Sequence, residues 1–220
     1  MTVQAKKVLD ACPVIIGYTV YIDLVRPLFP EKQFLSTPMR KEADRCKMAF
    51  EEVKKGVDVA MVCSGDSGIY GMAGLIYEIG IEIVPGITAA SGGAAVLGAP
   101  LMHDFAVISL SDLLTPWELI EKRLCAAAEA DFVICLYNPS SRKRADYLEK
   151  ACEIILKSRS EETVCGLVKN IGREGELYEI MTLKKLKTTQ ADMFTTVYIG
   201  NSNTKELNGK MVTPRGYKDV

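Results

Sequence analysis

The sequence predicts an α/β protein of two domains, residues 1–103 and 104–220. Apolar runs of strand length alternate along the chain with segments of helical periodicity. Continuously apolar strands are typical of parallel sheets that are covered by helices. A second series of such elements begins after His103–Asp104, and we expect the domain boundary there.

The first series alternates helices with short strands. Lys41–Lys55 has apolar residues at helical spacing, and Val57–Cys63 is a continuous apolar run that leads into a Gly-rich turn. The expected helices are Val3–Cys12, Lys41–Lys55, Gly71–Ile79 and Thr88–Leu97, and the expected strands are Val14–Ile16, Val57–Cys63 and Ile81–Val84.

The second series contains the clearest helix, Pro116–Ala130. Thr115 can cap it, Pro116 suits its first position, and Glu118 lies three residues after the cap. The other expected elements are helix Arg144–Lys157 and strands Phe105–Leu110, Phe132–Tyr137, Thr163–Val168 and Thr195–Ile199.

Composition excludes several classes of protein. The 27 Lys and Arg residues balance 28 Asp and Glu residues, so the chain lacks the overall positive charge typical of nucleic-acid-binding proteins. The apolar runs are too short for a membrane span, and Met1–Asp10 lacks the apolar core of a signal peptide. We therefore expect a soluble, cytoplasmic protein without nucleic-acid or membrane partners.

The cysteines predict neither a metal site nor a disulfide framework. There are 7 of them, an odd number, and the chain has a single histidine. No CxxC pair occurs, and His103 lies far from any cysteine pair. Free thiols suit a reducing compartment.

Four loops follow predicted strands and could line one crevice, because ligands of open α/β sheets bind beyond the carboxyl ends of strands. The simpler interpretation makes Asp66 a turn cap, Thr88 a helix cap and the cations of the third loop a solvated surface. The loops are Cys63–Gly71, Val84–Ala90, Leu136–Arg144 and Lys169–Glu176.

These loops carry a family resemblance that runs from Thr2 to Lys218. The chain resembles the precorrin-3B C-17 methyltransferases, a branch of the tetrapyrrole methylase family. The matching segments are Cys63–Gly74 (CSGDSGIYGMAG), Val84–Ala90 (VPGITAA), Ser109–Glu118 (SLSDLLTPWE), Tyr137–Arg144 (YNPSSRKR), Asn170–Glu176 (NIGREGE) and Met211–Tyr217 (MVTPRGY).

The resemblance implies an S-adenosylmethionine-dependent enzyme of cobalamin biosynthesis. It implies the two-domain tetrapyrrole methylase fold, with the cofactor in the interdomain cleft, and a homodimer. The implied reaction is methylation of precorrin-3B or cobalt-precorrin-3 at C-17 of ring D, with ring contraction. The many free thiols slightly favour the cobalt-containing substrate over the metal-free one.

The resemblance also implies site residues. The implied cofactor-binding residues are Asp66, Ile69, Thr88, Ala89, Leu136, Tyr137, Ile171 and Thr195. The substrate carries many carboxylates, and the cations expected to pair with them are Arg142, Arg144 and Arg173. No residue is assigned as a catalytic acid or base.

The chain departs from the family at two places. Relatives begin with a strand and a GxGPG loop before the helix that here starts near Thr2, so roughly a dozen residues are absent from the first βα unit. The Gly80–Ile81 junction is also shorter than the roughly two to six residues usual between a helix and a parallel strand.

A sulfonium methyl is already activated, so the enzyme's main task is to align it with an electron-rich carbon and exclude water. Three other functions remain open. They are methylation of another ring carbon, non-catalytic binding of a corrinoid, and dinucleotide-dependent redox chemistry, which the absence of GxGxxG disfavours.

Overall fold

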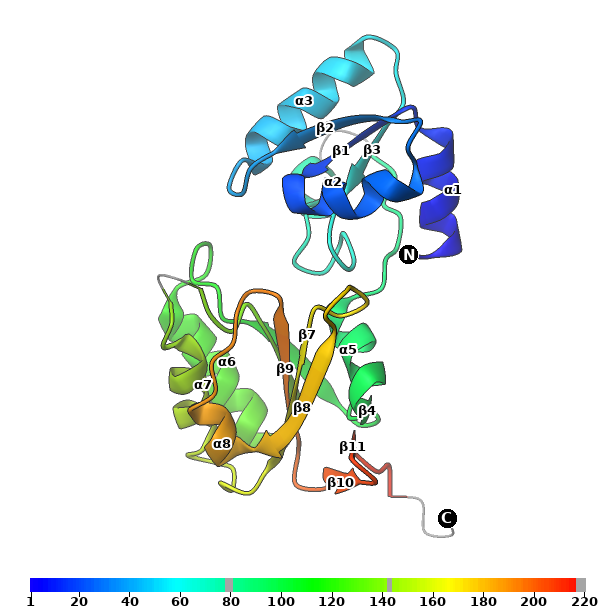
Figure 1. Ribbon diagram of the computed structural model, residues 1–220. Coiled ribbons are helices and arrows are strands. Elements are labelled where there is room, and N and C mark those ends of the chain that lie inside the picture. The colour runs from blue at the N-terminus through cyan, green and yellow to red at the C-terminus, as the bar shows by residue number, and fades with distance from the viewer. Residues whose placement is uncertain (78–80, 142–143, 217–220) are drawn as a thin grey trace. The chain divides into compact units, whose positions relative to one another are not determined.

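The computed structural model describes residues 1–77, 81–141 and 144–216 (Figure 1). The chain divides into two compact units, Met1–Thr88 (unit 1) and Ala89–Val220 (unit 2). Helix Ala89–Leu97 therefore groups with the second unit, although it precedes the predicted boundary at His103–Asp104. The domain boundary at His103–Asp104 therefore stays a prediction.

Unit 1 is built on a three-stranded parallel sheet of order β2-β1-β3. The central strand is almost completely buried, because helices pack on both of its faces. The strands are β1 (Val14–Tyr18), β2 (Gln33–Thr37) and β3 (Val59–Val62). The helical segments are α1 (Val3–Ala11), α2 (Thr19–Val25), η1 (Arg26–Leu28), α3 (Glu42–Lys54) and α4 (Ala73–Ile76).

One face of this sheet carries the core of unit 1. Ile15 packs there with Leu9 of α1, Ile22 of α2 and Ala60 of β3. Helix α3 contacts all three strands and lies over the other face in Figure 1. At the start of α1, the hydroxyl of Thr2 accepts a hydrogen bond from the Ala5 N–H at 3.1 Å, which caps the helix.

The end of unit 1 differs from the sequence prediction. Ile81–Val84 forms no strand, and the described part of the predicted helix Gly71–Ile79 forms only the short α4. Residues 78–80, and with them the Gly80–Ile81 junction, lie outside the described residues. Segment 81–88 is a loop, and the Ser67 hydroxyl donates to its Val84 carbonyl at 3.4 Å.

Unit 2 is built on a five-stranded mixed sheet of order β5-β6-β9-β7-β8. Only β5 and β6 are parallel, and the other three pairings are antiparallel. The predicted parallel sheet is therefore wrong for this unit. The strands are β5 (Phe105–Ser109), β6 (Val133–Tyr137), β7 (Val164–Lys169), β8 (Leu177–Thr182) and β9 (Thr195–Ile199).

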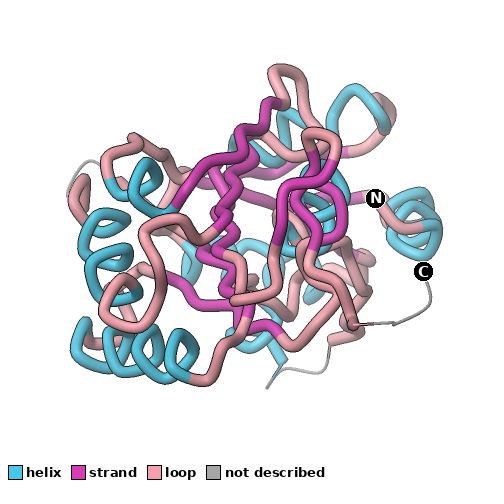
Figure 2. Tube along the Cα trace, turned by 90° about the horizontal axis from the view of Figure 1, so that it is seen from below, coloured by secondary structure: helices cyan, strands magenta, loops and turns pink. Residues whose placement is uncertain are grey.

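Helices cover both faces of this sheet. Figure 2 shows a row of helices along one side of the strands. These helices are α6 (Trp117–Glu129), α7 (Tyr147–Ile155) and α8 (Leu183–Lys187), and their core includes Leu136 and Val197. The other face packs on α5 (Ala89–Leu97) through Cys135 and Tyr198. Alternate residues of β6 and β9 thus serve opposite cores.

The remaining elements are small. A three-stranded sheet of order β10-β11-β4 is formed by β4 (Gly98–Ala99), β10 (Lys205–Leu207) and β11 (Lys210–Val212). At the start of α6, Pro116 occupies the N-cap position and no side chain caps the helix, so the cap expected from Thr115 is wrong.

Candidate functional site

In unit 1, Asp66 joins two of the loops that the sequence singles out. Its Oδ1 accepts the Gly68 N–H at 2.8 Å, and its Oδ2 accepts the Gly86 N–H at 2.8 Å. The backbones also touch, because a Cβ on Gly86 would lie 1.9 Å from the Gly65 carbonyl oxygen. The Gly-rich turn and the Pro-Gly turn are therefore one packed feature, which residue 86 can complete only as glycine.

Ile69 and Thr88 belong to the same two loops. Ile69 is exposed, and its N–H donates to the Asp66 carbonyl at 3.3 Å. Thr88 is half-buried and directly precedes α5. Tyr70 follows with a positive φ of 53°, which turns the chain sharply toward α4.

In unit 2, four predicted cofactor residues lie at one edge of the sheet. Strands β6 and β7 both run antiparallel to β9, so their carboxyl ends meet the start of β9 at the same edge. Asn138 and Asn170 end β6 and β7 in the left-handed conformation, each with φ 53°. The four residues that this edge brings together are Leu136, Tyr137, Ile171 and Thr195.

Tyr137 connects this edge to the fifth predicted residue of unit 2, Ala89. The Tyr137 hydroxyl oxygen accepts the N–H of Ala90 at 2.6 Å. This N–H belongs to the first turn of α5, where backbone donors have no partner within the helix. Tyr137 thus caps the helix that begins with Ala89.

Leu136 and Thr195 face constraints that the sequence does not reveal. The Leu136 side chain is fully buried in the core under α6, α7 and α8, on the opposite face from Tyr137. Only its main chain can reach a ligand at the sheet edge. The Thr195 hydroxyl donates to Asp192 Oδ1 at 2.9 Å, and Lys169 pairs with the same carboxylate at 2.7 Å.

The predicted substrate cations have different surroundings. Arg142 lies outside the described residues. Arg144 is largely buried, with 14% of its side chain exposed, and its Nε donates to Asp112 Oδ1. Arg173 is half-buried, and its guanidinium lies 5.9 Å from the centre of the Phe194 ring.

Asp112 belongs to the same group, although it was not predicted from the sequence. Its carboxylate accepts both the Arg144 Nε and the Tyr147 hydroxyl, the latter at 2.7 Å. The hydrogen bond from Tyr147, followed by that from Arg144, lowers the pKa of Asp112. The same bond raises the pKa of Tyr147. Asp112 stands in the SLSDLLTPWE motif and Arg144 ends YNPSSRKR, so this contact joins two of the motifs that carry the family resemblance.

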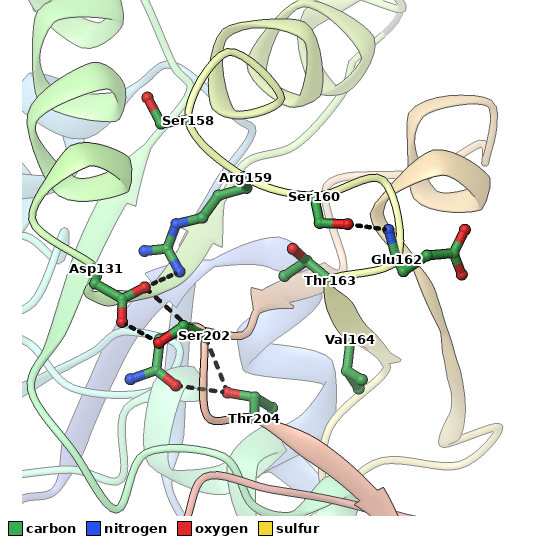
Figure 3. Close-up of a pocket in the computed structure, with 10 residues that line it drawn as sticks. Asp131, Ser158, Arg159, Ser160, Glu162, Thr163, Val164, Ser202 and Thr204 are labelled. Atoms are coloured by element: carbon green, nitrogen blue, oxygen red, sulfur yellow. Dashed lines mark hydrogen bonds and ion pairs between the residues drawn. The ribbon is translucent and has the colours of Figure 1, made fainter.

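A cavity of about 370 Å³ lies at the opposite edge of the unit 2 sheet (Figure 3). Arg159 is buried beside it, pairs with Asp131, and donates to the carbonyls of Ala128 and Phe132 at 3.0 Å. The guanidinium therefore links its own loop to the backbone at Ala128 and Phe132. None of the predicted site residues lines this cavity.

Two further features concern the described residues only. Their His, Cys, Asp and Glu side chains form no group of three that could hold a metal ion. No helix in the described ranges combines the length and apolar character needed to cross a membrane.

The sequence matches the family described as Tetrapyrrole (Corrin/Porphyrin) Methylases over residues 1–187. A probable cobalt-factor III C(17)-methyltransferase of Salmonella typhimurium is 46% identical over 225 residues, which cover 99% of this chain and 93% of that protein. A precorrin-3B C(17)-methyltransferase of a Sinorhizobium species is 37% identical over 233 residues, covering 99% and 91%.

Solved structures share the fold. The methyltransferase CobJ superposes with a TM-score of 0.89 at 32% identity, covering 97% of this chain and 93% of that one. A uroporphyrin-III C-methyltransferase of Thermus thermophilus, complexed with S-adenosyl homocysteine, superposes with a TM-score of 0.69 at 17% identity, covering 91% and 90%. The chain belongs to the tetrapyrrole methylase family, and its α/β fold is the fold of that family.

Proposed function

We propose that this protein methylates a cobalt-containing corrin precursor at C-17, with ring contraction, in cobalamin biosynthesis. The observation that carries this proposal is the 46% identity to the cobalt-factor III methyltransferase of Salmonella over almost the full length of both chains. Identity to the precorrin-3B enzyme is lower, at 37%, which favours the cobalt substrate over the metal-free one.

We propose S-adenosylmethionine as the methyl donor, bound by the residues that the family resemblance indicates. When bound, this cofactor supplies a methyl group on a positively charged sulfur. A free carboxylate beside the sulfur would stabilise the ground state more than the transition state, in which that charge is disappearing. The site should therefore offer the sulfur main-chain and neutral groups.

Two carboxylates near the proposed residues fit this requirement, because each has protein partners. Asp66 accepts two backbone N–H groups. Burial raises the pKa of Asp192, but hydrogen bonds from Lys169 and Thr195 outweigh burial and lower it overall. The hydroxyl of Tyr137 and the main chain around Ala89 and Ile171 are the neutral groups of unit 2.

For the substrate we propose that Arg144 pairs with a carboxylate of the corrin ring. Its Nε is taken by Asp112, and within the described ranges its two Nη groups make no hydrogen bond. Those two groups form a fork that matches a carboxylate. Arg142 and Arg173 are proposed to help neutralise the other acidic side chains of the substrate.

We also propose a cytoplasmic homodimer, following the family resemblance. All 7 cysteines are free, which suits a reducing compartment. Light scattering on the purified protein measures the mass directly. A monomer at micromolar concentration would remove the dimer from the proposal.

The decisive experiment combines the protein with ¹³C-methyl S-adenosylmethionine and cobalt-factor III under anaerobic conditions, followed by NMR of the product. We expect one labelled methyl group at C-17 of a contracted ring. A label on another ring carbon would identify a different methylase. Corrinoid binding without turnover would identify a carrier. Parallel incubation with precorrin-3B decides between the two substrates.

A further inference from the structure

Tyr198 is a buried polar residue that the proposed function does not use. It lies in β9, has no exposed surface, and faces α5. Its hydroxyl lies 2.7 Å from the Ala89 carbonyl oxygen and 3.0 Å from the Ala90 carbonyl oxygen. These carbonyls are the first two of α5, so the hydroxyl donates into the opening turn of the helix.

Gly93 makes this approach sterically feasible. A Cβ at Gly93 would lie 2.3 Å from the Tyr198 hydroxyl oxygen and 2.9 Å from Cδ1 of Ile171. Both distances are shorter than normal contacts between such atoms, so the helix can approach the sheet this closely only without a side chain at that position. Tyr198 and Ile171 therefore share the space opposite Gly93.

Tyr137 holds the same turn from the other side of one peptide unit. Its hydroxyl accepts the N–H of Ala90, and the Ala89 carbonyl of the same peptide unit accepts the Tyr198 hydroxyl at 2.7 Å. The tyrosines come from neighbouring strands, since Cys135 of β6 pairs with Tyr198 of β9. A turn held at both its N–H and its carbonyl is fixed in rotation as well as in position. Burial raises the pKa of Tyr198, so its hydroxyl remains a donor at physiological pH.

We infer that Tyr198 is a positioning residue for the cofactor, which sets Ala89 relative to Tyr137 and Ile171 without touching the ligand itself. The inference rests on the proposed function, because these three residues are among the proposed cofactor contacts in unit 2. It adds that cofactor affinity depends on a hydroxyl buried behind the contact surface.

The test measures binding of S-adenosylhomocysteine by calorimetry to the full chain and to Tyr198→Phe. We expect the Kd to rise about 3- to 10-fold, because binding must then order the first turn of α5, and one net hydrogen bond sets the size of that cost. The KM for cobalt-factor III should stay within about twofold. The thermal midpoint should fall by no more than about 2–4 °C, the shift that one net hydrogen bond gives in a chain of this size. Tyr178→Phe is the matched control, since its hydroxyl contacts Lys210 and no proposed cofactor residue.

A second pair of variants keeps the test independent of folding. Gly93→Ala should also weaken cofactor binding, because its Cβ collides with the Tyr198 hydroxyl. Adding Tyr198→Phe to Gly93→Ala removes the closest colliding atom and should recover part of the affinity. Such a recovery is a coupling between the two positions that independent structural damage would not give.

The outcomes separate the inference from the proposed function. If the unaltered protein does not bind S-adenosylhomocysteine, the proposed cofactor is wrong and the inference falls with it. If the unaltered protein binds and Tyr198→Phe binds equally well, the inference alone is overturned. Equal losses of cofactor and corrinoid affinity, or no recovery in the double variant, would likewise assign Tyr198 a general structural role.

Discussion

The carboxylate of Asp112 pairs with the guanidinium of Arg144, 32 residues further along the chain. Tyr147 donates to the same carboxylate from the first turn of α7. Three side chains, two of them from the matching motifs and one from α7, thus form one small network in unit 2. Its effect is to fix the direction of the Arg144 fork.

Asp112→Asn should weaken binding of the substrate rather than binding of the cofactor. The amide keeps the shape of the side chain but loses the charge that orients Arg144. We expect the KM for cobalt-factor III to rise about 3- to 10-fold, which corresponds to roughly one charge-assisted hydrogen bond. The Kd for S-adenosylhomocysteine should stay the same. Glu161→Gln, which breaks the exposed pair with Lys184, is the control and should change neither constant. An unaltered KM in Asp112→Asn would contradict the assignment of Arg144.

The same network predicts a pH dependence of stability. The hydrogen bonds from Tyr147 and Arg144 lower the pKa of Asp112 in the folded state. The resulting stabilisation is complete above the ordinary aspartate value of about 3.9, and it is lost as pH falls through the lower folded pKa. Urea unfolding of the protein and of Asp112→Asn should therefore differ most near neutral pH and converge below about pH 4. Curves that stay equally far apart down to pH 2 would argue against this origin.

Asp66→Ala should damage both loops of unit 1. The change leaves the N–H groups of Gly68 and Gly86 without their acceptor. We expect a loss of about 1–3 kcal/mol in the free energy of unfolding, and weaker cofactor binding in calorimetry. Asp66→Asn retains one acceptor oxygen. Its stability and its cofactor affinity should therefore lie between those of the unaltered protein and those of Asp66→Ala. If Asp66→Ala binds the cofactor with full affinity, neither loop belongs to the cofactor site.

Gly86→Ala tests how tightly the two loops pack. Its Cβ would lie 1.9 Å from the Gly65 carbonyl oxygen, so one loop must move. Forced overpacking of this kind typically costs about 1–3 kcal/mol. Gly74→Ala is the matched control, because a Cβ at that position has no atom within 4 Å. Thermal unfolding of the two variants should separate them clearly, and equal midpoints would show that the loops are not rigidly packed.

The elements predicted correctly have strong local patterns. β1 and β6 are short apolar runs that are buried in the structure, and α6 has a long helical period. β2 escaped prediction because polar and apolar residues mix in Gln33–Thr37. β8 escaped because it is an edge strand whose first residues are exposed.

Strand direction is what local patterns could not provide. An apolar run such as Thr195–Ile199 looks the same in a parallel or an antiparallel sheet when both faces are covered. The run Ile81–Val84 shows the opposite error, since an apolar pattern alone does not make a strand without a partner.

The sequence predicted which loops carry the candidate site residues, but not which residues those side chains contact. Asp66, Tyr137 and Arg144 stand in recognisable motifs, so the sequence could name them. Their partners Gly86, Ala90 and Asp112 are distant in sequence, between 20 and 47 residues away, and only folding brings them together. Tyr198 lies in the middle of an apolar strand, where it reads as an ordinary core residue.

The position of β9 has a consequence for how the protein is made. This strand is last in sequence among the five of its sheet, yet it lies in the middle, between β6 and β7. Until the ribosome has released Thr195–Ile199, those two strands have no partner on their inner edges. Unit 2 therefore cannot complete its sheet until β9 has been made, and the nascent chain carries two open strand edges up to that point.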